Sequence, residues 1–157
     1  MKPSVYLETS IISYLAARPS RDPLIAAHQQ VTRDWWTTAP NRYELFISEA
    51  VVEEVGGGDQ DAASKRLALV AGIPSLLVTP ENIRLGQRIA REASLPTKAG
   101  IDALHVAIAA DHRIGLLLTW NCKHIASPTF RPRIESVCRA AGLTPPEITT
   151  PYEMLGM

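Results

Sequence analysis

The feature that most constrains the fold of this chain is the alternation of short apolar runs with longer segments of helical periodicity. The apolar runs are Val5–Leu7, Leu45–Ile47, Leu76–Val78, Leu116–Leu118 and, more weakly, Ile148–Thr150. Runs that are apolar on both faces are typical of strands in a buried parallel sheet. Each run is therefore expected to be a strand, and each segment between two runs is expected to hold at least one helix.

The segments between the runs place apolar residues three or four positions apart, which gives each helix one apolar stripe. These stripes are Leu24, Ala27, Val31 and Trp35; Leu85, Ile89 and Ala93; and Ile101, Leu104 and Ile108. Thr79–Glu81 predicts an N-cap followed by proline at the first helical position. Gly56–Gly58 ends a helix that begins near Ser48, and Gly142 followed by Pro145 ends the last helix. Strands that alternate with helices predict right-handed crossovers and a three-layer α/β/α sandwich with a central parallel sheet.

The length and the charge balance of the chain limit the number of domains and the classes of protein to consider. The 157 residues predict a single domain over residues 1–157. Lysine plus arginine and aspartate plus glutamate both number 16, which argues against a protein that coats nucleic acid with a broad basic face. This balance still allows a nuclease whose positive charge comes from bound metal. Cys122 and Cys138 lack metal-site spacing, and no signal peptide or membrane span is recognisable, so we expect free thiols, a cytoplasmic protein and no membrane partner.

Polar residues follow the expected strands at the edge of the sheet where open parallel sheets form their sites. Glu8–Ser10 follows the first strand, Ser48 the second and Thr119–Asn121 the fourth. The helix after Ser48 adds three acids, which are Glu49, Glu53 and Glu54. Asp102 lies near the start of the helix that precedes the fourth strand, and its small and apolar helical neighbours predict that its face looks toward the protein. Acids, an amide and hydroxyls are thus expected to converge on one crevice.

Such a cluster favours a divalent cation. Convergent carboxylates repel one another unless a cation lies among them. Oxygen ligands without a converging histidine or cysteine favour Mg²⁺ or Mn²⁺. Such an ion can activate a water and neutralise a phosphodiester in its transition state, which is the chemistry of hydrolysis without a covalent enzyme intermediate.

Each candidate also has an ordinary structural explanation. Glu49 at a helix start is a dipole complement, and Asp102 alone could be the same. One of Glu53 and Glu54 is a solvated helix edge. The remaining candidates fit plain caps or an Asx cap; these are Thr9, Ser10, Ser48 and Asn121.

Two histidines and a stripe of arginines also have both a functional and an ordinary structural interpretation. His105 is interpreted as a partly buried helix residue and His124 as a residue at the rim, because neither has an obvious carboxylate partner. Arg84, Arg88 and Arg91 form a stripe that is typical of a solvated face, with an RNA-facing role as the alternative.

The order of these pieces resembles the PIN-domain family and, within it, the VapC-like toxins of bacterial toxin–antitoxin pairs. The resemblance runs from Tyr6 to Leu155. Its most specific pieces are Leu7–Ser10, Ile47–Ser48 with Glu54–Val55, Asp102–Ala107 and Leu118–Asn121. Members of the family typically have a first acid in an Asp-Thr-Ser-like turn, a Ser-to-Glu element, a third acid at a helix start and a fourth acid after a threonine.

The match assigns these positions to Glu8, to Ser48 with Glu54, to Asp102 and to Asn121. Glu8 departs from the usual aspartate by a longer side chain of the same charge. Asn121 replaces an acid by a neutral amide, which leaves three carboxylates for one divalent ion and puts a second ion in question. The resemblance further implies a sheet of order 3-2-1-4-5, a Mg²⁺- or Mn²⁺-dependent ribonuclease, a homodimer and an antitoxin that blocks the site with a basic side chain.

The leading hypothesis is a metal-dependent endoribonuclease in which Glu8, Glu54 and Asp102 hold the ion and Asn121 orients a water or binds the ion weakly. The residues expected to orient the carboxylates are Ser10, Ser48 and Thr119. A catalytically weak module that binds RNA or a protein partner is the alternative, because Asn121 and the balanced net charge favour it. A phosphohydrolase with Asp102 or Glu8 as nucleophile is a third hypothesis, although it requires an Asp-x-Asp-like element that Glu8–Ser10 does not supply.

Overall fold

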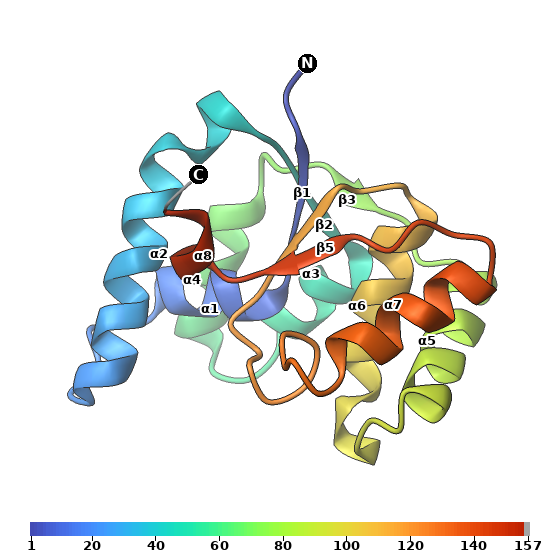
Figure 1. Ribbon diagram of the computed structural model, residues 1–157. Helices are drawn as coiled ribbons and strands as arrows, with labels where there is room; N and C mark the ends of the chain where they lie inside the picture. Colours follow the sequence, from blue (N-terminus) through green and yellow to red (C-terminus); the bar gives the residue numbers. More distant parts are fainter. Residues whose placement is uncertain (156–157) are drawn as a thin grey trace.

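The computed structural model describes residues 1–155, in which a five-stranded parallel sheet lies between two layers of helices (Figure 1). The strands are β1 (Ser4–Leu7), β2 (Glu44–Ser48), β3 (Ser75–Leu76), β4 (Leu116–Leu118) and β5 (Glu147–Thr149). Their order is β3-β2-β1-β4-β5, and all four neighbouring pairs are parallel. The expected fold class and strand order are confirmed. Gly156 and Met157, which the expected single domain includes, lie outside the described residues.

The helices follow from this strand order. They are α1 (Thr9–Ala16), α2 (Pro23–Arg42), α3 (Glu49–Val55), α4 (Gln60–Val70), α5 (Pro80–Glu92), the 3₁₀ helix η1 (Thr97–Ala99), α6 (Gly100–Asp111), α7 (Arg131–Ala140) and α8 (Pro151–Met154). The chain steps from β1 to β2 and β3 in one direction and then returns to β4 and β5 in the other. Right-handed crossovers therefore place α1 to α4 on one face and α5 to α7 on the other. Figure 1 shows these two groups, with α8 beside α2.

The centre of the sheet is as apolar as the sequence predicts. Val5, Tyr6 and Leu7 of β1 are fully buried, and so are Leu117 and Leu118 of β4. The two strands pair in register, with Leu7 opposite Leu118. These adjacent strands are where the strand order reverses, and in open α/β sheets ligands bind outside the carboxyl ends of the strands at such a reversal.

The third strand is shorter than the sequence predicts, and the last helix lies further along the chain than predicted. β3 ends at Leu76, and Leu77 is exposed because the chain leaves the sheet edge there to enter the capping box that Thr79 and Asn82 form at the start of α5. Gly142 ends α7 with a positive φ, but α7 is not the last helix, since Thr150 caps the short α8. An edge strand is paired on one side only, so apolar residues beyond Leu76 have no neighbouring strand to bury them.

Two of the three predicted apolar stripes are buried only in part. Leu24 at the start of α2 is 66 % exposed, whereas Trp35 near its end is in the core. The helix has 20 residues and is thus about 30 Å long, while the five residues of β2 span about 17 Å, so the first turns of α2 pass beyond the sheet. On α6, Ile101 is exposed and Ile108 is buried. Among residues 1–155, no helix combines the length and hydropathy required to cross a membrane.

Candidate functional site

Glu8 is the first residue after β1 and occupies the point where the strand order reverses. Its backbone N–H donates to the Leu118 carbonyl of β4 at 3.1 Å, which continues the β1–β4 pairing by one residue. Glu8 is also the N-cap of α1, so its carboxylate lies at a helix start, where backbone N–H groups stabilise negative charge. Thr119 follows Leu118 in the same way. The paired strands therefore deliver an acid and a hydroxyl to one place.

The Glu8 carboxylate is 5 % exposed and accepts three hydrogen bonds. The Ser10 hydroxyl donates to Oε1 at 2.5 Å, the Thr119 hydroxyl donates to Oε1 at 2.6 Å, and the Ser10 N–H donates to Oε2 at 3.2 Å. Ser10 and Thr119 thus lie where residues that orient a carboxylate would lie. All three donors are neutral, and no basic side chain of residues 1–155 forms an ion pair with Glu8. A buried carboxylate without a cationic partner suits a bound cation.

Glu54 comes from α3, and its Oε1 accepts two hydrogen bonds at 2.6 Å, from the Thr9 hydroxyl and from Nε2 of His105. Burial by itself raises the pKa of Glu54, but the hydrogen bond from His105, the positive charge that His105 carries only when protonated, and the hydrogen bond from the Thr9 hydroxyl outweigh it, so the pKa is lowered overall. Glu53, one position earlier, is exposed. Of the two acids that the sequence could not separate, Glu54 is therefore the one that turns toward α1 and α6.

Tyr6 and His105 form a buried pair beneath Glu54. The Tyr6 hydroxyl lies 2.6 Å from Nδ1 of His105 and 2.7 Å from the Ser48 hydroxyl, and all three side chains are fully buried. Burial raises the pKa of Tyr6 far above its usual range; the Ser48 hydrogen bond offsets part of this, and the charges of Glu8 and Glu54 add to it. The Tyr6 hydroxyl is therefore protonated and neutral, and the negative charges of both acids oppose its ionisation. Ser48 caps α3 and reaches Glu54 only through Tyr6 and His105.

Asp102 lies in the first turn of α6, with its side chain 19 % exposed. Its Oδ2 is 3.2 Å from Nδ1 of His124, so His124 has a carboxylate partner. The interpretations of both histidines were wrong on this point, because His105 is fully buried and also contacts a carboxylate. No local sequence signal marks the contact of His105, because its carboxylate partner Glu54 lies 51 positions away in the chain.

Asn121 occupies the position that the family gives to a fourth acid, but its amide oxygen is engaged. Its Oδ1 accepts from the His124 N–H at 3.0 Å, and its own N–H donates to the Thr119 hydroxyl at 2.9 Å. This is the Asx cap that the sequence left open. A role of Asn121 toward an ion remains a prediction.

The structure also accounts for the remaining candidates. Thr9 and Ser10 are not simple caps, since both hydroxyls donate to acids and Glu8 is the N-cap of α1. Arg84 and Arg88 form exposed ion pairs with Glu81 and Glu92 on α5, as expected of a solvated face.

The donor chemistry fits a hard divalent cation, although the carboxylates are not gathered around one point. Glu8, Glu54 and Asp102 reach the same sheet edge from three different elements and offer only oxygen. Within residues 1–155, no three acidic, histidine or cysteine side chains are close enough to hold one ion as they stand. Oε2 of Glu54 and Oδ1 of Asp102 accept no hydrogen bond from the described residues, so both atoms are available to an ion.

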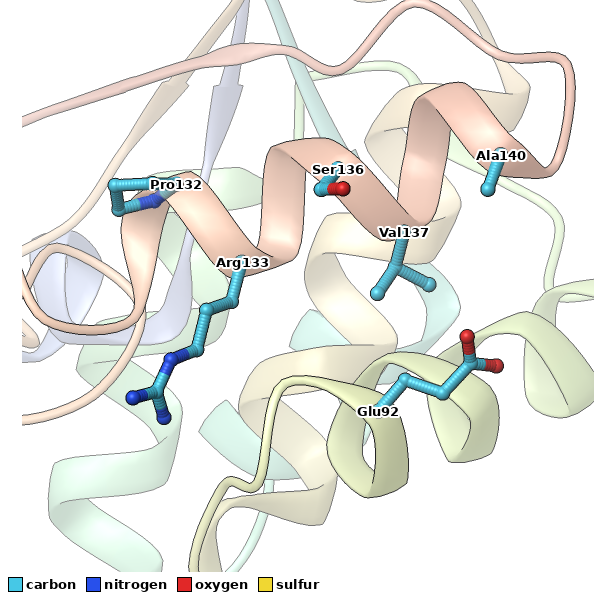
Figure 2. A pocket seen from close by; sticks show the side chains of 6 residues that line it. All are labelled: Glu92, Pro132, Arg133, Ser136, Val137 and Ala140. Atoms are coloured by element: carbon cyan, nitrogen blue, oxygen red, sulfur yellow. The ribbon is translucent and has the colours of Figure 1, made fainter.

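A separate hollow lies between α5 and α7 (Figure 2). It encloses about 400 Å³ and is lined by Glu92, Pro132, Arg133, Ser136, Val137 and Ala140. None of the predicted site residues lines it, and Figure 2 shows Arg133 and Glu92 pointing away from each other. We therefore do not assign the site to this hollow.

Comparison with known proteins agrees with the observed fold. Residues 5–121 match the model of the PIN domain family. No curated protein sequence matches the chain. Among solved structures, VapC20 of Mycobacterium tuberculosis, a sarcin-ricin loop cleaving toxin, is similar at a TM-score of 0.59 and 16 % identity, over 73 % of this chain and 87 % of that one.

Two further structures cover almost the entire chain. VapBC2 of Rickettsia felis, bound to a DNA fragment from its promoter, has a TM-score of 0.59 and 12 % identity over 93 % of this chain and 97 % of that one. FitAcB of Neisseria gonorrhoeae has a TM-score of 0.59 and 16 % identity over 94 % and 98 %. At these identities the likeness shows a shared fold.

Proposed function

The chain belongs to the PIN domain family, and on that basis we propose that it is a Mg²⁺- or Mn²⁺-dependent endoribonuclease that hydrolyses RNA phosphodiester bonds as the toxin of a toxin–antitoxin pair. The observation that carries the proposal is the burial of Glu8 together with the groups that form hydrogen bonds to its carboxylate. This acid is 5 % exposed at the point where the strand order reverses, and it accepts hydrogen bonds from three neutral donor groups, with no ion-pair partner among residues 1–155. A bound divalent ion would supply the missing positive charge.

The proposal gives each residue a task. Glu8, Glu54 and Asp102 would hold the ion, which would activate a water and neutralise the phosphodiester. Ser10 and Thr119 keep the Glu8 carboxylate in one orientation through their hydroxyls. Ser48, at the start of α3, acts further from the acids, through the Tyr6 hydroxyl.

The partners follow from the same charge argument. The chain has no net charge, so the local positive charge that attracts RNA would come from the ion. An antitoxin could block the acidic edge by placing a basic side chain where the ion binds. The similarity in fold to VapC20, a sarcin-ricin loop cleaving toxin, supports a toxin, and the antitoxin partner is proposed from the family resemblance. We propose a cytoplasmic homodimer on the family resemblance alone.

Two observations favour a second candidate function, a PIN-like module that binds RNA or protein with weak catalysis. The Asn121 amide oxygen is committed to the His124 N–H, and the carboxylates are not gathered around one point. Such a module would bind RNA equally well with and without Mn²⁺, whereas the proposed enzyme would cleave it only with the ion.

The test is RNA cleavage by the wild type with Mg²⁺, with Mn²⁺ and with EDTA, alongside Asp102→Asn. The matched control is Asp111→Asn, because Asp111 lies on the same helix nine residues further, about 13 Å along the axis, and contacts Asn82. We expect cleavage that needs the ion, no cleavage by Asp102→Asn and normal cleavage by Asp111→Asn. Cleavage that persists in EDTA, or equal activity of both variants, would refute the metal mechanism.

A further inference from the structure

Tyr6 and His105 are buried polar residues to which the proposed function gives no task of their own. Neither is exposed, and together they connect the Ser48 cap on α3 to the Glu54 carboxylate on the same helix by a route through β1 and α6. Tyr6 is 99 positions from His105 in sequence, and His105 is 51 from Glu54. The chain thus brings a tyrosine, a histidine and an acid into one line of short contacts.

The hydrogen-bond partners fix the direction of this line. The Val51 N–H donates to the Ser48 hydroxyl oxygen, so the Ser48 hydroxyl proton is available to donate to Tyr6. The Tyr6 hydroxyl then donates to Nδ1 of His105, and the proton of a neutral imidazole must lie on Nε2. There it donates to Oε1 of Glu54, which is an acceptor only.

The other proton arrangements leave buried groups unsatisfied. If the neutral imidazole carried its proton on Nδ1, its bare Nε2 would face the ionised Glu54 oxygen at 2.6 Å, and two acceptors would oppose each other. If both ring nitrogens were protonated, Tyr6 would have to donate to Ser48, and the Ser48 proton would have no acceptor among the described residues. A buried unsatisfied donor is costly, so the Nε2–H arrangement is preferred.

The line of contacts also decides which Glu54 oxygen is free. His105 on α6 and the Thr9 hydroxyl on α1 both donate to Oε1 of Glu54. No described residue donates to Oε2. A glutamate has a flexible side chain, and two donors on one oxygen restrict its rotation and direct the other oxygen elsewhere.

We propose that His105 is a positioning residue for Glu54: Tyr6 and Ser48 hold its imidazole as the Nε2–H tautomer, and this N–H presents Oε2 of Glu54 to the divalent ion. The inference rests on the proposed function, because it assigns Glu54 to the ion. Outer hydrogen bonds of this kind typically affect metal affinity about 10- to 100-fold. A histidine that only filled the core would affect folding and leave metal affinity unchanged.

The decisive substitution is Tyr6→Phe, which removes one hydroxyl and keeps the ring. Tyr43→Phe is its matched control, since Tyr43 is also buried but precedes β2 at the opposite edge of the sheet. His105→Leu removes both ring nitrogens, and His105→Gln keeps a side-chain N–H that can reach Glu54. Asn82→Ala, which breaks the α5 capping box, controls for a general loss of stability.

The measurement is the Mn²⁺ dissociation constant by calorimetry, combined with the long-range ¹H–¹⁵N spectrum of the wild-type histidines near neutral pH. We expect the proton of His105 on Nε2. Affinity should fall about 10- to 100-fold in Tyr6→Phe and His105→Leu and less in His105→Gln, with both controls binding as the wild type does. If His105→Leu does not fold, Tyr6→Phe decides the outcome.

The failure of this inference differs from that of the proposed function. Wild-type affinity in Tyr6→Phe and His105→Leu, or a proton on Nδ1, would overturn the positioning role alone. A wild-type protein that binds no Mn²⁺ would overturn the proposed function, and the positioning role with it.

Discussion

Thr119→Val removes one hydroxyl from beside the Glu8 carboxylate, and its cost can be worked out from the structure. The Thr119 hydroxyl donates to Glu8 at 2.6 Å, and Glu8 is 5 % exposed, so water cannot replace the lost donor easily. A hydrogen bond to a charged group contributes about 1.5–3 kcal/mol. The Asn121 N–H also loses its acceptor, but Asn121 is only half-buried, and water can satisfy it.

The expected loss of unfolding free energy is therefore about 1.5–3 kcal/mol in EDTA. For a chain of this size, each kcal/mol lowers the melting temperature by about 2–4 °C, so the melting temperature should fall by about 3–12 °C. The assay is urea unfolding followed by circular dichroism, with thermal melts as a second measure.

Thr149→Val is the matched control. Thr149 lies opposite Leu118 in the neighbouring strand and is equally buried, but its hydroxyl donates only to a neutral carbonyl, at 3.4 Å. This change should cost less than about 1 kcal/mol. If Thr119→Val is no more destabilising than Thr149→Val, the hydroxyl does not hold the Glu8 carboxylate and the reasoning about its three donors is wrong.

Three further predictions concern the acids, the amide and the buried thiol. Glu54→Gln should lose most RNA cleavage and Glu53→Gln little, because adjacent helical residues point about 100° apart; equal losses would contradict the assignment. Asn121→Asp should keep its cap, since aspartate caps as well as asparagine, and should show a larger Mn²⁺-induced rise in melting temperature; an equal or smaller rise would mean that this residue does not face the ion. Burial raises the pKa of the Cys138 thiol to about 11. The thiol therefore ionises first in the unfolded chain, and stability should fall between about pH 9 and 11 more steeply in the wild type than in Cys138→Ala, by at most about 1.4 kcal/mol per pH unit; equal slopes in urea unfolding would argue against a buried thiol.

The fold was largely predictable because its signals are local. The fully buried runs of β1 and β4 and the cap at Thr79 are visible in a few consecutive residues. The errors come from positions that depend on the length of an element relative to the sheet. Leu24 fits the helical stripe of α2 yet is exposed, because that helix is longer than the strands it covers.

The candidate site was predictable only in part. The order of strands and helices brings Glu8, Glu54 and Asp102 to one sheet edge, and periodicity carries that information. Periodicity does not indicate which side-chain atoms of residues far apart in the sequence are in contact. The contact of His105 with Glu54 joins residues 51 positions apart, and no local pattern distinguishes it from an ordinary buried histidine. The same limit applies to Asn121, whose amide oxygen could face an ion or cap the next turn with the same sequence.

The most direct test of the central claim is a crystal structure of the wild-type protein with Mn²⁺, in which anomalous scattering locates the ion. One anomalous peak is expected at the carboxyl edge of β1 and β4, within coordination distance of Glu8, Oε2 of Glu54 and Asp102. His105 should remain hydrogen-bonded to the other Glu54 oxygen. A protein that cleaves RNA with Mn²⁺ but shows no peak at this edge, or a peak held by other residues, would contradict the account.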